Sequence, residues 1–322
     1  MTQGLNEDNL LGKSYFSGGW MSIYKPKEIS SFSALKKIKK KFLIKKIGHA
    51  GTLDPLASGV LPIAFGAATK TIPYLIASKK KYKFSIQWGI KTSTHDLEGE
   101  VIDRSDLRPS KENLLKVIKG FEGEIYQRPP RFSAVKVNGK RAYQLARNGE
   151  HFSLDMKKVK IYDIILSNYN KNNDSEFIIT CSKGFYIRSL VRDICKKLGV
   201  LGTVNMLERQ EVGPFSLENT FSLENIENLV HIAPAGMVGG NLLIPLGEVL
   251  DDIPALPISD LEAKRFQQGQ IILNNNLIKF SGLGSEVLLL NNKKPIGLAT
   301  VSENSFKPKK VFSEEIFNLR SI

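Results

Sequence analysis

The sequence predicts a mixed α/β protein with a small second domain at its C-terminal end. Apolar residues with a two-residue period at 81–90 indicate a strand, and apolar residues at three- and four-residue steps in 33–46 and 187–198 indicate helices. Near residue 250 the charge balance changes and prolines punctuate the chain, which predicts a domain boundary. With 322 residues, 42% of them hydrophobic, the chain is long enough to bury a core in each domain.

Two segments carry a helical pattern. In 33–46, Leu35, Ile38 and Phe42 share one face and lysines occupy the other, so the apolar stripe is expected to pack inward. In 187–198 the apolar stripe ends just before a glycine, which is the usual C-terminal signal of a helix. Its first residues follow a predicted strand, and side chains at such a junction often point into a cleft.

Three segments of the large domain carry a strand pattern. At 81–90 the even positions from Tyr82 onward are apolar and the odd positions from 81 to 87 are polar, as in a half-buried strand. Alternation places Tyr82 on the core face with Phe84, although its position near the start of the strand also suits the rim of a cleft. Further strands are expected at 158–169 and 176–182, separated by glycine and asparagine turns.

The two ends of the chain differ from its middle. Beyond residue 250 we expect a short helix at 260–269 and strands at 270–274, 286–292 and 295–301. Residues 1–20 are polar and acidic where a signal peptide would be basic and then apolar. No stretch approaches the run of about 18 apolar residues that spans a membrane. A cytoplasmic protein is therefore expected.

Composition argues against metal or disulfide chemistry. The two cysteines, Cys181 and Cys195, give neither a disulfide framework nor a zinc site, so buried reduced thiols are expected. The four histidines are scattered and form no metal-binding motif: His49, His95, His151 and His231. We expect neither a metal nor a cofactor.

The positive charge is concentrated in one region. The net charge is +14, and residues 25–83 alone hold 14 lysines against two acidic residues, whereas residues 251–322 contribute only +1. Such a local field attracts polyanions, and nucleic acid is the favoured partner. Two alternatives stay open: a lysine run is often only solvated surface, and a membrane surface would also attract it, although no lipidation signal accompanies it.

The stretch "GHAGTLDPLASGVL" (48–61) has the composition of a loop with a special shape. It contains neither the phosphate-binding pattern G-x-x-x-x-G-K-[ST] nor G-x-G-x-x-G, which disfavours a nucleotide triphosphate site. Asp54 precedes a proline, so its backbone is held extended, and three glycines allow tight bends around it. Alone, this pattern describes either a plain turn or a turn that presents one carboxylate.

With its neighbours the stretch resembles a known family. "GHAGTLDPLASGVLPIAFGAATK" (48–70) is similar to the signature of the TruB-type pseudouridine synthases. The resemblance continues, in the family's order, at "YKP" (24–26), "KYKF" (81–84), "TSTHDLEGE" (92–100), "RFSAVKVNGKRAYQLARNGE" (131–150), "CSKGFYIRSLVRD" (181–193) and "VGPF" (212–215). It covers most of residues 20–216.

The resemblance implies a fold and an activity. It implies a central, mainly antiparallel sheet with flanking helices, in a catalytic domain over 19–250 that follows the N-terminal extension 1–18. It also implies a small β-rich, PUA-like domain over 251–322. The implied activity is the conversion of uridine-55 in the T-loop of tRNA to pseudouridine by a monomer without metal or cofactor. The base is flipped out, its C–N glycosidic bond breaks, and it is rejoined through carbon.

The resemblance also implies site residues. Asp54 matches the catalytic aspartate, acting as nucleophile or as base, and Arg188 matches the arginine that pairs with it. Tyr82 matches the residue that stacks on the uracil, and His49 the one that helps hold the flipped nucleotide. Further matches line or support the site: Lys25, Lys70, Tyr186 and Leu207. Residues 128–150 resemble a mobile arm that closes on the RNA, with cations at Arg128, Arg131, Lys136, Lys140, Arg141 and Arg147.

The sequence departs from the family pattern in two places. Glu28 stands where a glycine is usual, so the family's turn is not assured there. Glu208 and Glu211 stand where arginines are usual, which indicates a missing RNA contact or salt bridge. Two other functions stay open: an RNA-binding or RNA-folding protein without catalysis, and a guide-dependent synthase of the archaeal and eukaryotic type. "VGPF" and the weakly charged C-terminal segment favour the stand-alone bacterial form.

Overall fold

The structure of the chain is a computed structural model. It describes residues 18–41, 46–170, 174–226, 244, 246–250, 253–273, 286–302 and 305–312. The predicted N-terminal extension, apart from Gly18, lies outside these residues, as do 42–45 of the first predicted helix and His231.

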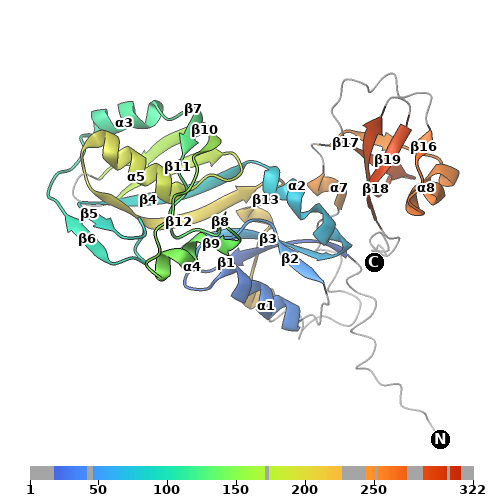
Figure 1. Ribbon diagram of the computed structural model, residues 1–322, viewed down its shortest axis with the longest axis horizontal. Coiled ribbons are helices and arrows are strands. Elements are labelled where there is room, and N and C mark those ends of the chain that lie inside the picture. Colours follow the sequence, from blue (N-terminus) through green and yellow to red (C-terminus); the bar gives the residue numbers. More distant parts are fainter. Residues whose placement is uncertain are drawn as a thin grey trace, which may run out of the picture.

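Ten strands of the described residues form one large sheet (Figure 1). Its pairs are antiparallel except β1 with β14 and β3 with β12, which confirms the mainly antiparallel sheet. The order is β14 (Phe221–Ser222), β1 (Gly18–Lys25), β3 (Ser58–Gly66), β12 (Gly202–Val212), β4 (Lys80–Trp88), β11 (Asp174–Cys181), β10 (Lys157–Asn168) and β7 (Gly123–Gln127), with β2 (Ile47–His49) on β3 and β13 (Phe215–Ser216) on β12. Two hairpins stand apart: β5 (Ile90–Thr92) with β6 (Val101–Arg104), and β8 (Lys136–Val137) with β9 (Lys140–Arg141).

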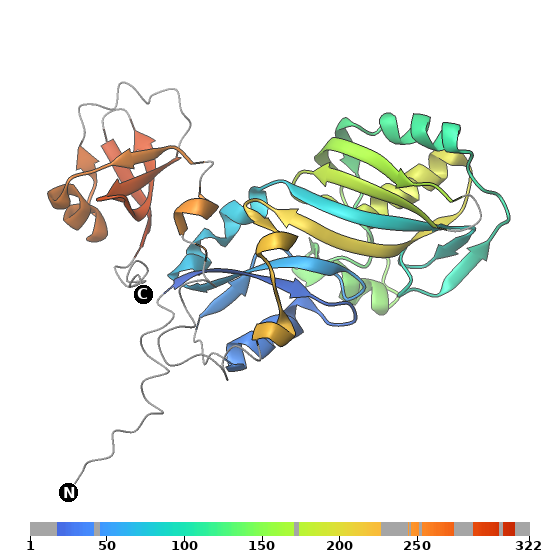
Figure 2. The same cartoon turned by 180° about the vertical axis from the view of Figure 1, so that it is seen from behind.

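Helices cover one face of the part of this sheet that contains β4, β10, β11 and β12. Both α3 (Lys111–Lys119) and α5 (Ile187–Leu198) lie on that face, in front of the strands in Figure 1 and behind them in Figure 2. Further helical segments of this region include α1 (Ser31–Lys41), η2 (Ala67–Thr71), α2 (Ile72–Ala77), α4 (Ala142–Arg147) and η3 (Leu217–Asn219). None of the helices in the described ranges combines the length and the apolar run needed to cross a bilayer.

The local predictions for this half of the sheet are confirmed. Helix α5 has the predicted bounds and ends at Gly199, whose φ of 68° suits a left-handed C-cap. Along β4, Phe84 and Ile86 are fully buried beneath the helices. On the opposite face Lys83 pairs with Glu176 at 3.0 Å, and Lys81, Lys83 and Gln87 are partly exposed, whereas Ser85 between them is buried.

A second sheet of five strands follows. Its order is β15 (Ala255–Pro257), β17 (Glu286–Asn291), β18 (Lys294–Ser302), β19 (Ser305–Val311) and β16 (Ile272–Leu273), with α7 (Leu246–Val249) and α8 (Asp260–Gln267) beside it. The predicted helix and strands are present, which fits a β-rich, PUA-like domain.

The two sheets share apolar contacts. One face of β17 and β18 packs with α8 into a small core, whereas Leu288 and Leu298 on the other face join a cluster with Trp20 and Leu75 of the large sheet region. Polar contacts reinforce this contact region, because the Tyr74 hydroxyl donates to Glu286 at 2.8 Å. The small sheet is therefore packed against the large one in this structure.

Candidate active site

The glycine-rich stretch 48–61 is not a single loop. Its first two residues belong to β2 and its last four to β3, so only residues 50–57 connect the strands. The prediction missed β3 because every residue from Ser58 to Phe65 is buried, and a strand buried on both faces lacks alternation. Asp54 therefore lies in the connection 50–57, between the end of β2 and the start of β3.

Arg209 explains two of the glycines. This β12 side chain is 1% exposed, and its Nε and Nη2 donate to the carbonyls of Val60 at 2.8 Å and Gly51 at 3.0 Å. Gly51 has φ 90°, and a Cβ there would lie 3.1 Å from Nη1 of Arg209. Gly59 has φ 106°, and its Cβ would lie 2.2 Å from the Arg209 carbonyl oxygen. Gly59 is needed because β12 pairs closely with β3 at this point, and Gly51 is needed because the Arg209 side chain lies against the loop 50–57.

The third glycine has a separate reason. A Cβ on Gly48 would lie 2.6 Å from the Ile72 side chain at the start of α2. Gly48 therefore allows β2 to approach α2 closely. The stretch does not form a phosphate cradle; its glycines serve close packing.

Asp54 and Arg188 form an ion pair in this loop. Nη2 of Arg188, at the start of α5, lies 2.7 Å from Oδ2 of Asp54. The Arg188 side chain is 6% exposed, whereas the Asp54 side chain is 38% exposed, so one edge of the carboxylate is open to a ligand. Burial raises the pKa of Asp54, and the charge of Arg188 opposes that shift.

Asp96 is a partner that sequence reasoning missed. Its side chain is 1% exposed, and its Oδ2 lies 3.3 Å from Nη1 of Arg188. The negative charge of Asp96 adds to the upward shift in the pKa of Asp54. The motif "TSTHDLEGE" contains Asp96, but nothing in its spacing indicates that it meets α5.

Two carbonyl groups complete the surroundings of Arg188. Its Nη2 donates to Phe132 at 3.0 Å and its Nη1 to Thr94 at 3.4 Å. Phe132 belongs to the predicted arm, so one guanidinium contacts the Asp54 loop, the segment 94–96 and the arm. Arg188 fixes these three segments relative to one another.

Tyr186 is brought close to this pair. It precedes α5, and its main chain is held by Gln127, whose amide accepts from Tyr186 N at 2.8 Å and donates to its carbonyl at 3.0 Å. Burial raises the pKa of the Tyr186 phenol, and the nearby charge of Asp54 adds to the effect. Gln127 is a second residue that sequence reasoning missed.

Tyr82 and Leu207 lie on neighbouring strands. Tyr82 is half-buried and packs against the main core, so its sequence-based assignment to the core face agrees with the structure. Burial raises the pKa of its phenol, and the Arg209 guanidinium opposes that shift. Leu207 is 7% exposed on β12 and is opposite Phe84 of β4.

His49 and Lys25 support the loop. Burial, with the charge of Arg209, lowers the pKa of His49, so its ring is neutral at pH 7. Its Nδ1 is enclosed without a hydrogen-bond partner among the described residues. Lys25 is fully buried, and its Nζ donates to the carbonyls of Pro26 (2.8 Å), Ile29 (2.7 Å) and Pro55 (3.3 Å). Lys25 thus holds the backbone beside Asp54.

Lys70 is placed elsewhere. Its Nζ donates to the carbonyl of Val311 in β19 at 2.9 Å, so it joins the large sheet region to the small sheet. The "ATK" segment forms η2, which turns Lys70 toward the C-terminal strands. In this structure its polar contact is with the small sheet, not with the Asp54 loop.

The departures from the family pattern have structural counterparts. Glu28 has φ 69°, and its N–H donates to the Pro55 carbonyl at 2.8 Å, so the tight turn forms without glycine. Glu208 accepts from the Tyr24 hydroxyl at 2.9 Å, and Glu211 pairs with Lys81 at 3.1 Å. Both glutamates therefore have polar partners within the protein.

The arm begins beside the site and projects from it. Asn138 and Gly139, with φ of 50° and 83°, form the predicted turn of the β8–β9 hairpin. Its cationic residues are all exposed: Arg128, Arg131, Lys136, Lys140, Arg141 and Arg147. Three of them contact the arm itself. Arg131 donates to the Glu150 carbonyl at 2.9 Å and Arg141 to that of Ala134 at 2.5 Å, and the Arg147 guanidinium lies 5.7 Å from the ring centroid of Tyr143.

A second basic surface lies on and near α1. It comprises exposed lysines that have no acidic partner within 4 Å among the described residues: Lys27, Lys36, Lys37, Lys39 and Lys40. Ser31, at the start of α1, bonds through its hydroxyl to the N–H (2.8 Å) and C=O (3.0 Å) of Leu53. The basic helix is therefore attached next to Asp54.

The described residues contain no cluster of three or more potential metal ligands.

Comparison with known proteins identifies the family. The family model described as "TruB family pseudouridylate synthase (N terminal domain)" matches residues 39–187. A protein of Caulobacter sp. (strain K31) named tRNA pseudouridine synthase B is 44% identical over 255 residues, which cover 79% of this chain and 81% of the relative. The chain belongs to the TruB family of pseudouridylate synthases. A protein of the same name from Ehrlichia chaffeensis is 41% identical over 92% of this chain and 99% of its own.

Solved structures confirm the pseudouridine-synthase fold. A chain of an H/ACA RNP bound to a substrate RNA containing 2′-deoxyuridine superposes with a TM-score of 0.70 at 21% identity, covering 97% of this chain and 89% of its own. A chain of a Cbf5-Nop10-Gar1 complex gives 0.69 at 24% identity, covering 92% and 85%. At these identities the likeness concerns the fold alone.

Proposed function

We propose that this chain is a tRNA pseudouridine synthase that isomerises uridine-55 of the T-loop. Its curated relatives are named tRNA pseudouridine synthase B at 41–44% identity. The observation that carries the proposal is the Asp54 carboxylate, which is open on one edge and held by a buried arginine. That arrangement gives a fixed carboxylate at a place that a base can reach.

The proposed reaction needs one carboxylate. The N1–C1′ bond of the uridine breaks, the uracil turns, a C5–C1′ bond forms, and the proton on C5 leaves while N1 gains one. Asp54 assists as a nucleophile at C1′ or as the base of a glycal route. Both routes need its ionised form, and Arg188 favours that form against the effect of burial. The composition of the nucleotide does not change, so the reaction consumes no second substrate.

The neighbouring side chains suit a flipped nucleotide. Tyr82 presents an aromatic ring that stacks on the uracil, because a ring face accepts any base. Tyr186 and Leu207 line the same base site, and Lys25 supports its backbone. Extrusion of a base costs a few kcal/mol, and the neutral ring of His49 helps to hold the nucleotide out.

The RNA is bound over several parts of the chain. Residues 19–250 form the catalytic domain, in which the arm 128–150 closes on the T-stem-loop, and residues 251–322 form a PUA-like domain that contacts tRNA. The unpaired lysines near α1 add to the attraction for phosphates. We propose that the enzyme is cytoplasmic. We also propose that it is a monomer, since the proposed site residues come from a single chain.

Tritium release tests the function. The substrate is a T-stem-loop RNA carrying 5-³H-uridine, and the protein is compared with Asp54→Asn, which keeps the shape of the side chain. We expect the parent chain alone to release tritium, without guide RNA and with chelator present. If neither protein releases tritium while both bind the RNA, an RNA-binding protein becomes the better account. Release only with a guide RNA would instead favour a guide-dependent synthase.

A further inference from the structure

Gln127 joins the end of an edge strand to the helix that carries Arg188. It is the last residue of β7, which lies at one edge of the large sheet next to β10. Its side chain is 2% exposed, and its amide contacts Tyr186, the residue before α5. The amide Nε2 donates to the Tyr186 carbonyl at 3.0 Å, and Oε1 accepts from the Tyr186 N–H at 2.8 Å. One buried amide therefore holds both polar groups of one backbone residue.

This contact lies at the start of α5, where the helix needs a cap. Tyr186 is the N-cap residue, and its own side chain makes no capping hydrogen bond in the described part of the chain. Its backbone is extended while its carbonyl accepts the first helical bond, from the Leu190 N–H at 3.1 Å. Gln127 thus fixes, from outside the helix, the residue at which the helix begins. That residue lies two positions before Arg188.

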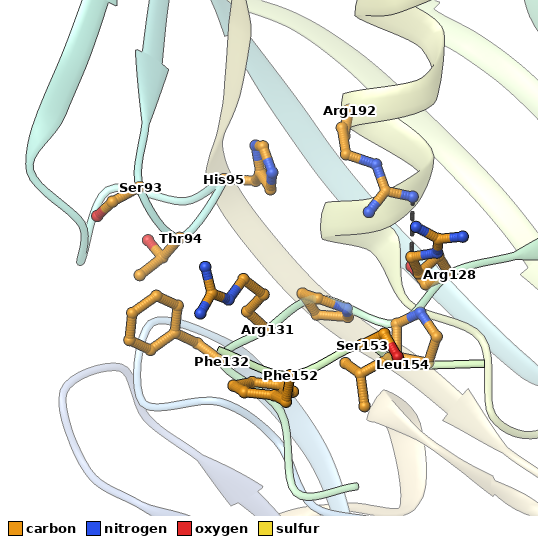
Figure 3. A pocket seen from close by; sticks show the side chains of 12 residues that line it. Ser93, Thr94, His95, Arg128, Arg131, Phe132, Phe152, Ser153, Leu154 and Arg192 are labelled. Carbon is orange, nitrogen blue, oxygen red and sulfur yellow. Dashed lines mark hydrogen bonds between the residues drawn. The ribbon is translucent and has the colours of Figure 1, made fainter. Parts of the chain in front are cut away.

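The next residue after Gln127 is also tied to α5. The Arg128 carbonyl accepts from Ser189 Oγ at 2.8 Å and from Arg192 Nη2 at 3.2 Å, and Figure 3 draws the second bond. The contacted residues 186, 189 and 192 are spaced by three, so they form one stripe along the first turns of the helix. Contacts along such a stripe fix the rotation of the helix about its axis. Arg188 adjoins the stripe, because it lies four residues before Arg192.

Side-chain packing is open on this side of α5. A pocket of about 310 Å³ borders Arg192 and the first residues of the arm, 128–132, and extends to the segment 93–95 (Figure 3). The apolar stripe of α5 is buried in the main core on the other side of the helix. Close packing resists movement, whereas a pocket leaves room for it. The hydrogen bonds of residues 127 and 128 therefore supply a constraint that packing does not provide on this side.

The ion pair at the site depends on the direction of Arg188. Its Nη2 lies 2.7 Å from Oδ2 of Asp54 and its Nη1 lies 3.3 Å from Oδ2 of Asp96, so the guanidinium has to reach two carboxylates at once. A small rotation of α5 would lengthen at least one of these distances. In an active site a misplacement of about 1 Å can lower a rate about 100-fold. A residue that fixes the start of α5 can therefore control the rate without touching the substrate.

We propose that Gln127 is a positioning residue for the isomerisation, because its amide sets the start of α5 and thereby aligns Arg188 with Asp54. The proposal rests on the proposed function, since it assigns Gln127 to the rate of that reaction. An amide suits the role because it carries a donor and an acceptor side by side, which neither a carboxylate nor an aliphatic side chain does. At 2% exposure Gln127 is too deeply buried to contact RNA, so its role concerns the chemical step and not affinity.

Single-turnover kinetics test this role. Gln127→Met keeps the length of the side chain and removes both hydrogen bonds. Tritium release from the 5-³H-uridine T-stem-loop is followed with protein in excess, at a series of protein concentrations. We expect the maximal rate constant to fall about 10- to 100-fold. The protein concentration that gives half of the maximal rate should stay within about threefold of the parent value. Partial unfolding would do the opposite, since it lowers the concentration of folded protein and leaves the maximal rate constant unchanged.

A double-mutant cycle identifies the residue through which Gln127 acts. It combines Gln127→Met with Arg188→Lys, which keeps a positive charge but lacks the planar guanidinium that reaches both Asp54 and Asp96. We expect Gln127→Met to lower the rate constant by less than about threefold in the Arg188→Lys protein, because the alignment that it disturbs is already lost. Equal fold losses in the two backgrounds would show that Gln127 does not act through Arg188 and would overturn the inference.

Two further variants separate positioning from folding. Ser175→Ala removes a hydroxyl of β11 that accepts from the Trp88 indole N–H at 3.0 Å, another buried bond of the same sheet. It should leave the maximal rate constant unchanged, and a loss equal to that of Gln127→Met would overturn the inference. If Gln127→Met does not fold, Ser189→Ala decides, since it removes only the bond to the Arg128 carbonyl. It should lower the rate constant about 2- to 10-fold, the effect of one hydrogen bond, and an unchanged rate constant would overturn the inference.

The outcomes separate this inference from the proposed function. If the parent chain releases tritium and folded Gln127→Met does so with the same maximal rate constant, the inference alone is wrong. If the parent chain releases no tritium from the T-stem-loop, the proposed function fails. The inference then fails with it, because no isomerisation remains for Gln127 to support.

Discussion

Replacement of Gly59 by alanine is expected to lower the free energy of unfolding by at least about 4 kcal/mol. Its φ of 106° lies outside the left-handed region that residues with side chains tolerate, and such strain costs about 1–3 kcal/mol. A Cβ there would lie 2.2 Å from the carbonyl oxygen of Arg209. The Cβ is fixed to the backbone of β3 and the oxygen belongs to the backbone of the paired strand β12, so β3 has to move away from β12. This movement disturbs the bonds that Arg209 donates to Val60 and Gly51, each worth about 1.5–3 kcal/mol.

Gly139→Ala is the matched control. Gly139 also has a positive φ, 83°, but no atom lies within 4 Å of a Cβ built there. Only the conformational cost of about 1–2 kcal/mol applies, and reduced entropy of the unfolded chain offsets part of it. Urea unfolding measures both variants, and on heating Gly59→Ala should lower the Tm by roughly 10 °C. Values for the two variants that agree within about 1 kcal/mol would refute the argument that Arg209 dictates this glycine.

Three further predictions concern charge and backbone shape. The charge of Asp96 raises the pKa of Asp54. In Asp96→Asn, the loss of the single-turnover rate of pseudouridine formation on acidification should therefore occur at lower pH than in the parent chain. A loss at the same pH or at higher pH contradicts this coupling. Glu28→Gly should raise the free energy of unfolding by about 0.5–1 kcal/mol in a denaturant titration, since Glu28 has φ 69°, and a loss of stability would show that its side chain matters more. Lys136→Ala combined with Lys140→Ala should lower the salt slope of RNA binding by about 1.4 if both contact phosphates, and an unchanged slope would place the arm away from the RNA.

Local structure could be predicted where a single segment determines it. The bounds of α5 follow from its apolar stripe and from Gly199, whose φ of 68° ends the helix. The alternation of β4 is visible because one face packs into the core and the other carries polar side chains, of which Lys81, Lys83 and Gln87 are partly exposed. β3 escaped prediction because it is buried on both faces, so its sequence shows an apolar run without a period.

The site could be predicted only in part, because its geometry joins distant segments. Asp54 and Arg188 were paired through the family resemblance, and the structure brings them to 2.7 Å. Asp96 and Gln127 show no local sign of the residues they meet. Arg209 follows Leu207 on the inward face of β12, so a buried charge was visible in the alternation, but its partners in the Asp54 loop were not. The position of Lys70 in a family motif did not reveal its contact, because its side chain reaches Val311 of the small sheet.

The contact between the two sheets has a consequence for how the chain unfolds. Strands β17 and β18 bury both faces, one in their own small core and one in the cluster that also contains Trp20 and Leu75. A chain cut near residue 250 would therefore leave apolar side chains of the large sheet region in water and would be prone to aggregate. We expect calorimetry of the full chain to show one cooperative transition. In that transition the five-stranded sheet and the large sheet that carries the Asp54 loop unfold together.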